Sequence, residues 1–338
     1  MITATPALSV LLPVRDAAAT LDEAISSIRS QSVRHWELVA VDDGSTDESG
    51  EILRRHAGAD PRIRVATTGK RGLVPALEMA RAASRAPILA RMDADDFAEP
   101  SRLEAQLSLL ARHPGVALCG THVRYFPRSR VRDGARRYEA WLNGHRSHED
   151  LARDLWVECP LSHPTFAMRA SVVDRVGGYR EMAWPEDYDL VLRIWEAGLG
   201  LGVVPQVLHR WREGSERLSR VDSRYGPEAF RRVKLHFLSR TLLRKKEGVL
   251  VWGAGPTGKA FARSAIALGI PVRAFVDLDP RKIGQEVHGA PVIPPAGLDA
   301  FRDALALAAV GRPGAREEIR AALRDAGWVE GSDFVAVA

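Results

Sequence analysis

The sequence predicts an α/β fold, namely a doubly wound, mainly parallel sheet followed by a second, smaller α/β unit. Three observations lead to this prediction. Short apolar runs alternate with amphipathic helical segments over residues 1–120, which is typical of strand–helix repeats in a parallel sheet. Acidic turns follow two of these apolar runs. After residue 248 a new apolar run leads into a glycine-rich turn and another helical segment.

The first expected elements follow one another at regular intervals. We expect strands at 9–12, 37–41, 63–66, 88–91 and 116–120, with helices at 20–30, from 45, at 73–84 and at 101–112. The segments Thr20–Glu23 and Ser45–Glu48 have the S/T-x-x-E pattern of a capping box, which predicts that helices start there. Ligands of such sheets bind beyond the carboxyl ends of the strands. Asp42-Asp43 and Asp93–Asp96 follow directly after expected strands and would therefore lie where a ligand binds.

The middle of the chain is less regular. Residues 124–160 are rich in Arg, His and Trp and are interpreted as an insertion or a substrate-facing region. A strand at 165–169, a helix at 187–197 and a strand at 201–208 then complete a first domain of residues 1–212.

Residues 213–247 change character, with many Arg and Lys residues interleaved with apolar residues at helical spacing. We interpret them as a basic helical linker, followed by a small domain of residues 248–338. Two interpretations of the linker remain open. It could contact an anionic membrane surface peripherally, or its apolar face could pack on a domain while the arginines are solvated.

Composition excludes several classes of function. The two cysteines, Cys119 and Cys159, form no C-x-x-C, which argues against a disulfide scaffold and a thiolate zinc site. The net charge of +5 gives no ground for a nucleic-acid partner. We see neither a secretory leader nor an apolar run approaching the roughly 20 residues that span a bilayer. The expected location is cytoplasmic, with at most a peripheral contact on the inner face of the membrane.

The turn Asp93-Ala94-Asp95 lies in the run RMDADDFAEPSRL, directly after an expected strand. A D-x-D alone is weakly specific, because helix caps and solvated turns give the same pattern. At a strand end, however, its carboxylates would face the ligand, and hard oxygen ligands select Mg²⁺ or Mn²⁺. A cation there could neutralise the charge that gathers on a diphosphate when a sugar leaves it.

Four ordered blocks resemble the family 2 glycosyltransferases, which are inverting enzymes with the GT-A fold. The run SVLLPVRDAAATLDEAISSIRSQSVRHWELVAVDDGSTDES resembles the family's N-terminal nucleotide-binding half. The later blocks are RGLVPALEMARAASRAPILARMDADD, LSHPTFAMRASVVDRVGGYRE and WPEDYDLVLRIWEAG. The resemblance covers about residues 7–212 in the family's order and spacing, and four blocks in order are far more specific than any one of them.

The resemblance implies a donor site. Three residues would border the nucleotide base: Pro13, Val14 and Asp43. The Asp43 carboxylate would accept a hydrogen bond from the base. Arg71 would approach the nucleotide. Asp93 would contact the ribose or sugar, and Asp95 would be the principal ligand of Mn²⁺ or Mg²⁺, with Asp93 beside it. The alternatives are a role of Asp42 and Asp43 in capping the turn and the next helix, and a solvated surface position for Arg71.

The resemblance also implies an acceptor side. Asp187 would be the general base that deprotonates the acceptor hydroxyl, the alternative being a cap at a helix start. Glu186 would be an acceptor or support residue whose charge keeps Asp187 basic. Three further residues would support the acceptor or lie near the diphosphate: His163, His209 and Arg210. The Q-x-x-R-W motif of processive members is absent, which favours transfer of a single sugar.

The turn Gly253-Ala-Gly255-Pro-Thr-Gly258 fits a dinucleotide-binding fingerprint, and Asp277 ends the next strand, where a ribose-binding acid would lie. This unit resembles the N-terminal half of a Rossmann domain. VDLDPRKIGQEVHGAPVI resembles segments in small nucleotide- or sugar-nucleotide-binding domains of surface-polysaccharide proteins. We expect only one mononucleotide-type half, and no Tyr-x-x-x-Lys follows, so packing or regulation is the alternative to binding NAD(P).

The function expected from these residues is metal-dependent, inverting transfer of a single sugar, of the hexosyltransferase type. The donor would be a nucleotide sugar and the acceptor a saccharide or a lipid-linked saccharide, in the synthesis of cell-surface polysaccharide, lipopolysaccharide or glycolipid. Two alternatives remain open. One is an NAD-dependent sugar oxidoreductase or epimerase that uses the C-terminal domain, and the other is a non-catalytic sugar-nucleotide-binding protein.

Overall fold

The computed structural model describes residues 5–214 and 217–338, which divide into two compact units. The first unit comprises the chain up to Leu151, Pro160–Met182 and Glu186–Val221. The second unit comprises Ala152–Cys159, Ala183–Pro185 and Asp222–Ala338. Two short segments from the first two thirds of the sequence therefore belong to the second unit, and the linker expected at 213–247 is divided between the units.

Eight strands of the first unit form one sheet within the described residues, in the order β3-β2-β1-β4-β7-β6-β8-β5. Their bounds are β1 (Leu8–Val14), β2 (Trp36–Asp42), β3 (Ile63–Thr67), β4 (Ile88–Arg91), β5 (Phe97–Ala98), β6 (Val116–Phe126), β7 (Ala167–Arg169) and β8 (Gly200–Arg212). The strands β3, β2, β1 and β4 run parallel, and β8 runs parallel to β6. Only β7 and β5 pair antiparallel with their neighbours, so the expectation of a mainly parallel α/β sheet is confirmed.

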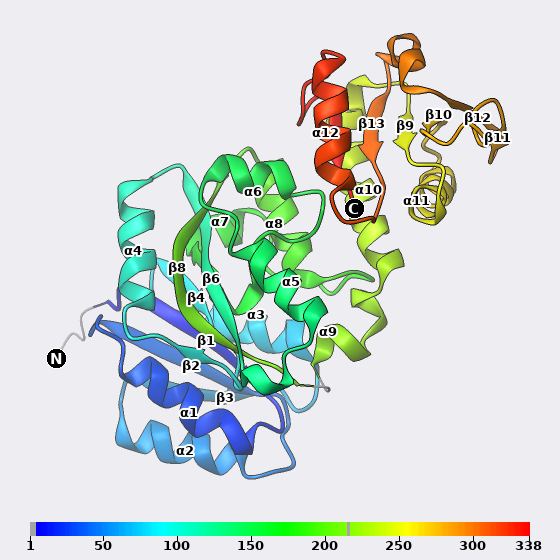
Figure 1. Ribbon diagram of the computed structural model, residues 1–338. Coiled ribbons are helices and arrows are strands. Elements are labelled where there is room, and N and C mark those ends of the chain that lie inside the picture. Colours follow the sequence, from blue (N-terminus) through cyan, green and yellow to red (C-terminus); the bar gives the residue numbers. More distant parts are fainter. Residues whose placement is uncertain (1–4, 215–216) are drawn as a thin grey trace. The chain divides into compact units, whose positions relative to one another are not determined.

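Helices cover both faces of the parallel part of the sheet (Figure 1). The helix bounds are α1 (Ala18–Arg29), α2 (Ser49–Ala59), α3 (Leu73–Ala83), α4 (Arg102–Arg112), α5 (Asp133–Leu142), α6 (His148–Asp154), α7 (Ala170–Arg175), α8 (Glu186–Glu196) and α9 (Leu218–Val221), with 3₁₀ turns η1 (Arg128–Arg130) and η2 (His163–Thr165). In Figure 1, α1 and α2 lie together on one side of β1–β3, and α3 lies on the other side. All seven residues of β1 except Pro13 are buried, as expected for a central parallel strand with both faces covered.

Both capping-box predictions are wrong about the helix starts. The helix α1 begins before Thr20, and α2 begins after the whole predicted box. The N–H groups at the start of α1 are instead satisfied by the loop before α2 and by the first residue of α2. Asp47 Oδ2 accepts from Ala18 N–H at 2.9 Å, and Ser49 Oγ accepts from Ala17 N–H at 2.8 Å.

The second unit contains its own sheet, in the order β11-β12-β10-β9-β13-β14. Its elements are β9 (Val249–Trp252), β10 (Val272–Val276), β11 (Glu286–Val287), β12 (Ala290–Ile293), β13 (Leu305–Ala308), β14 (Phe334–Ala336), α10 (Pro227–Arg240), α11 (Pro256–Ala267), α12 (Ala315–Asp325), η3 (Ser223–Tyr225), η4 (Leu242–Lys245) and η5 (Pro295–Phe301). All strand pairs are parallel except β11–β12. From β12 to β14 this is the doubly wound order 3-2-1-4-5, with parallel strands on both sides of β9. The expectation of a single mononucleotide-type half is therefore wrong.

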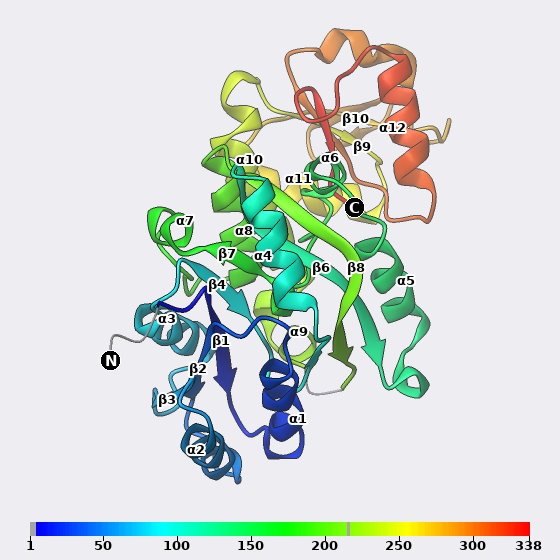
Figure 2. The same cartoon turned by 90° about the vertical axis from the view of Figure 1, so that its left-hand side faces the viewer.

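The basic segment expected at 213–247 is not one continuous helix but the succession of α9, η3, α10 and η4, with residues 215–216 outside the described part. Figure 2 shows α10 beside α11 of the second unit. The apolar side chains of α10 are buried: Ala229, Val233, Leu235, Phe237 and Leu238. They pack within the protein, so a membrane contact of this segment stays a prediction that rests on its arginines. Among the described helices, none combines the length and the apolar character that crossing a bilayer requires.

Candidate active site

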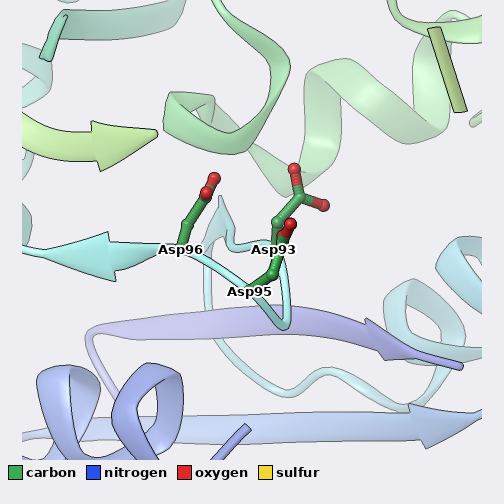
Figure 3. A group of neighbouring side chains, drawn as sticks. All are labelled: Asp93, Asp95 and Asp96. Carbon is green, nitrogen blue, oxygen red and sulfur yellow. The ribbon is translucent and has the colours of Figure 1, made fainter. Parts of the chain in front are cut away.

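The acidic turn after β4 brings three carboxyl groups together. Asp93, Asp95 and Asp96 each offer an oxygen atom, and these atoms lie within 4.8 Å of one another. Figure 3 shows the three side chains on the turn, pointing to the same side of it. Because β1 pairs in parallel with both β2 and β4, this turn lies at the same edge of the sheet as the turn after β2 that carries Asp43.

Asp96 is held by the end of β8 and is fully buried with His209. Its Oδ1 accepts from the Arg212 backbone N–H at 2.7 Å, and its Oδ2 lies 2.8 Å from His209 Nε2. Arg102 Nη1 lies 3.1 Å from His209 Nδ1, and since arginine can only donate, Nδ1 accepts and Nε2 donates to Asp96. His209 is thus a neutral support of the acidic turn, while Arg210 is half-exposed and bonded to Glu99 at 2.6 Å.

Asp93 and Asp95 have different surroundings. Arg91, which is buried, forms an ion pair with Asp93 at 2.6 Å. Among the described residues, no side chain of another residue donates a hydrogen bond to the Asp95 carboxylate, which makes it the most available of the three. Burial and then the charges of Asp96 and Asp93 raise the pKa of Asp95, and burial and then Asp93 raise that of Asp96. A bound cation would relieve this repulsion.

Arg91 connects the acidic turn to the start of α8. Besides its ion pair with Asp93, the Arg91 guanidinium interacts electrostatically with Tyr179 and Glu186. His163 Nε2 lies 3.0 Å from the Tyr179 hydroxyl, and His163 Nδ1 lies 3.5 Å from Glu186 Oε1. Burial, together with the charge of Arg91, lowers the pKa of His163 well below its ordinary value, so this imidazole is neutral at pH 7. The structure therefore brings His163 and Glu186 to the acidic turn.

Asp187 follows Glu186 at the first turn of α8 and is only half-buried. Its Oδ1 accepts from the Tyr188 backbone N–H at 2.7 Å, as a carboxylate at a helix start often does. The Asp187 charge acts on Tyr179, the residue on which Arg91 and Glu186 also act. Asp187 thus lies beside the Arg91–His163–Glu186 group and is its more exposed carboxylate.

The predicted donor residues lie at the ends of β1 and β2. Pro13 is half-buried and Val14 is buried, and the Val14 carbonyl accepts from the Asp43 N–H at 2.8 Å. The buried Asp43 carboxylate accepts from Thr68 Oγ1 at 2.5 Å and from the Arg71 N–H at 2.6 Å. It thereby orders the loop before α3 and sets the position of Arg71.

Two cations near the acidic turn do not stand out in the sequence. From the sequence alone, Arg91 is only the last residue of an expected strand, and Arg217 is only one of the linker arginines. An arginine at the end of an expected buried strand, two residues before a D-x-D turn, is a usable signal, because an uncompensated buried cation is costly and needs a carboxylate partner. Arg217 lies over the rings of Tyr125, far away in β6, and of Trp211 at the end of β8, and the Tyr125 contact leaves no local sequence pattern.

A family model described as glycosyl transferase family 2 matches residues 9–177, half of the chain. The chain belongs to this family. Among its relatives, the putative glycosyltransferase EpsE of Bacillus subtilis is 33% identical over 243 residues, covering 68% of this chain and 84% of the relative. The amylovoran biosynthesis glycosyltransferase AmsE of Erwinia amylovora is 29% identical over 254 residues, covering 70% and 93%. The uncharacterized protein y4gI of Sinorhizobium fredii is 32% identical over 248 residues, but this chain spans only 26% of its length.

Solved structures of glycosyltransferases share the fold of the first unit, which is of the GT-A type. TarS 1–349 of S. aureus in complex with UDP-GlcNAc has a TM-score of 0.56 at 15% identity, with 68% of this chain and 66% of that chain covered. The mannosyltransferase PcManGT of Pyrobaculum calidifontis, in complex with GDP-Man and Mn²⁺, has a TM-score of 0.50 at 19% identity, with 79% and 71% covered.

The glycine turn at residues 253–258 belongs to the second unit and lies outside the region that matches the family 2 model. A family model described as a CoA binding domain matches residues 244–326. Gly253 has a φ of +112°, and a Cβ on Gly258 would lie 1.8 Å from the Gly253 carbonyl oxygen, so α11 packs directly against the turn. Asp277 Oδ2 accepts from the Ala254 N–H at 2.9 Å and pairs with Lys282 at 2.9 Å. Asp277 therefore binds the glycine turn itself, and nucleotide binding by Gly253, Gly255, Gly258 and Asp277 stays a prediction.

Proposed function

We propose that this family 2 glycosyltransferase transfers a single sugar, with inversion, from a nucleoside-diphosphate sugar to a hydroxyl group. The observation that carries the proposal is the group of Asp93, Asp95 and Asp96, whose oxygen atoms lie within 4.8 Å of one another at the carboxyl end of β4. A parallel sheet binds its ligand at this edge, and the turn after β2 lies there as well.

The donor set fits Mn²⁺ or Mg²⁺, since it consists of carboxylate oxygens alone. Asp95 would be the principal ligand because its carboxylate is the least engaged by the described residues. Asp93 would contribute from beside it while paired with Arg91, and Asp96 would hold the turn in place through His209 and Arg212. When bound, the cation neutralises charge on the donor diphosphate.

Asp187 would remove the proton from the acceptor hydroxyl as that oxygen attacks the anomeric carbon from the face opposite the nucleotide. It is the half-exposed carboxylate at the start of α8, while Glu186 is buried and faces His163. The negative charge of Glu186 would make Asp187 more basic and so help it to accept the proton. Neutral His163, which contacts both Tyr179 and Glu186, would hold Glu186 beside the base.

The neighbours suggest the substrate class. TarS and PcManGT were solved with UDP-GlcNAc and GDP-Man, and AmsE acts in amylovoran biosynthesis. We infer a nucleotide-sugar donor of this kind and an acceptor in the synthesis of a surface polysaccharide, either a saccharide or a lipid-linked saccharide.

The test is the release of nucleoside diphosphate from a panel of nucleotide sugars with MnCl₂. With the donor that the wild type uses, Asp95→Asn and Asp187→Asn should each lower kcat by at least about 100-fold, the usual contribution of a charge-stabilising or proton-transferring group. Asp187→Asn should leave donor binding unchanged, because it acts on the acceptor.

Asp174→Asn is the matched control, since Asp174 is an exposed carboxylate of the same unit that pairs with Arg81. It should retain wild-type turnover. Unchanged turnover in both Asp95→Asn and Asp187→Asn would refute the proposed mechanism.

A further inference from the structure

The last residues of β8 are bound to the acidic turn. The Arg212 backbone N–H donates to Asp96, and Arg212 Nε donates to the Asp95 carbonyl oxygen at 2.5 Å. The neighbouring Trp211 stacks on Tyr125 of β6, with ring centroids 5.0 Å apart and an interplanar angle of 8°. An aromatic pair is thus fixed next to the proposed metal ligands.

Arg217 lies on this aromatic pair. Its guanidinium carbon is 4.2 Å from the centroid of Trp211 and 5.3 Å from that of Tyr125. The side chain is only 15% exposed, and its contact with the Glu213 carboxylate is long, at 3.8 Å. Glu213 makes its close ion pair with Arg220 instead. The guanidinium is therefore oriented by the two rings and by a hydrogen bond with the Tyr125 side chain. Because a guanidinium carries five N–H donors, others remain that can reach a further acceptor.

The charge of Arg217 acts on the acidic turn. After burial and the neighbouring carboxylates, Arg217 is among the groups that influence the pKa of Asp95 and of Asp96, and it lowers both. After burial and Tyr125, Asp96 and Asp93 are the groups that act on Arg217 in return. Arg217 therefore places a positive charge near the proposed metal ligands.

We propose that Arg217 binds the diphosphate of the donor and neutralises the charge that develops on it, and that Tyr125 and Trp211 are its positioning residues. This inference rests on the proposed function. The planar guanidinium can donate two parallel hydrogen bonds to phosphate oxygens while it stays stacked on the rings. Lysine, a point charge on a flexible stem, would lose the stacked orientation.

The experiment measures binding of UDP, GDP, ADP and dTDP, and of the matching monophosphates, to the full chain with MnCl₂ by calorimetry. Arg217→Ala should weaken the diphosphate that the wild type prefers by about 10- to 100-fold, the range for lost charge-assisted hydrogen bonds. The Kd of the matching monophosphate should change less than about threefold, because the monophosphate lacks the β-phosphate. Arg217→Lys should recover only part of the loss.

Two further variants test the positioning role. Trp211→Ala should weaken the same diphosphate by about tenfold, and Trp211→Phe should restore most of the binding. The double variant Trp211→Ala/Arg217→Ala should bind no more weakly than Arg217→Ala, since Trp211 acts through Arg217. Arg62→Ala is the control, because Arg62 also lies over a tryptophan, 3.7 Å from the centroid of Trp36, and should bind like the wild type.

The inference is overturned if Arg217→Ala binds the diphosphate as tightly as the wild type, or if it weakens the diphosphate and the monophosphate equally. If the double variant binds more weakly than Arg217→Ala by the full factor seen for Trp211→Ala alone, the two residues act independently. That result would refute the positioning role of Trp211. Failure of the proposed function gives a different result, in which the wild type with Mn²⁺ binds none of the four diphosphates.

Discussion

At the scale of single residues, the three aspartates of the acidic turn differ in their partners. Asp96 is engaged by His209 and Arg212, Asp93 pairs with Arg91, and Asp95 remains the most available. The sequence placed these aspartates after a strand and predicted a cation there. It could not show which of them is engaged, because His209 lies 113 residues from Asp96 in the chain.

The raised pKa of Asp95 predicts a pH-dependent metal effect. Burial and the neighbouring carboxylates raise this pKa to about 7, so Mn²⁺ must displace a proton from Asp95 below that pH. The increase in Tm caused by Mn²⁺ should therefore be large at pH 8 and small at pH 5.5. Thermal unfolding with and without MnCl₂ at the two pH values measures this, and Asp95→Asn should abolish the difference.

Without metal, the stability of the protein should change with pH in the opposite direction. A carboxyl group whose pKa is raised by folding, from 3.8 to about 7, contributes stability that is complete below its unfolded pKa and is lost as the pH rises toward 7. Relative to Asp95→Asn, the metal-free wild type should thus lose stability between pH 4 and pH 7. An equal Mn²⁺ effect on Tm at pH 5.5 and pH 8 would contradict this account.

At the scale of helices and strands, the start of α1 shows where local patterns fail. The S/T-x-x-E pattern from Thr20 predicted a cap, but the first N–H groups of α1 are satisfied by Asp47 and Ser49 from the next strand–helix unit. Thr20 Oγ1 instead donates to the Ala94 carbonyl in the acidic turn at 3.1 Å. Strand and helix types followed from periodicity, whereas caps supplied over long sequence distances could not be predicted.

The close packing of α11 on the turn after β9 predicts that alanine is tolerated differently at two glycines. An alanine Cβ at position 258 would overlap the Gly253 carbonyl. A Cβ on Gly255, whose φ is −92°, would have no described atom within 4 Å apart from its chain neighbours. Gly258→Ala should cost about 1–3 kcal/mol or more of unfolding free energy, and Gly255→Ala less than about 0.5 kcal/mol. Denaturant unfolding of the two variants measures this, and equal stabilities would show that the turn and α11 are not packed as described.

A buried arginine of α12 predicts a second difference. Arg320 is 2% exposed and binds Asp154 at 2.6 Å and Glu330 at 2.7 Å, whereas Arg324, one turn later, is 53% exposed. Arg320→Ala should destabilise the protein by about 3–5 kcal/mol, because it removes the buried cation that pairs with both Asp154 and Glu330, two largely buried carboxylates. Arg324→Ala should cost no more than about 1 kcal/mol. Both values come from denaturant unfolding, and a small effect of Arg320→Ala would mean that the buried network is absent.

At the scale of the whole molecule, the two units are interleaved along the sequence. Asp154 and Val157 come from the first half of the chain but belong to the second unit. Lys234, which is buried in α10, donates to the Val157 and Val337 carbonyl oxygens at 2.6 and 2.9 Å. Composition placed a boundary near residue 212, because it records a change of character along the chain but not which segments pack together.

Interleaving predicts the behaviour of a truncated chain. Ending the chain after Val221 removes Lys234 and Arg320, so Asp154 loses its ion pair with Arg320, the Val157 carbonyl loses Lys234, and the Val157 side chain loses the core of the second unit. The truncated chain should unfold at a lower temperature than the first transition of the full chain and should aggregate more readily. A truncated chain as stable and soluble as the full protein would show that residues 152–159 do not depend on the second unit.

The central claim is that the carboxylates after β4 hold a cation together with the donor diphosphate, within reach of Asp187. Anomalous diffraction from crystals grown with MnCl₂ and the preferred nucleoside diphosphate tests it most directly. We predict a manganese peak at coordination distance from Asp95, roughly 2.0–2.6 Å, with diphosphate oxygens on the same ion. A manganese peak away from Asp93–Asp96, or a nucleotide bound only at the Gly253 turn, would contradict it.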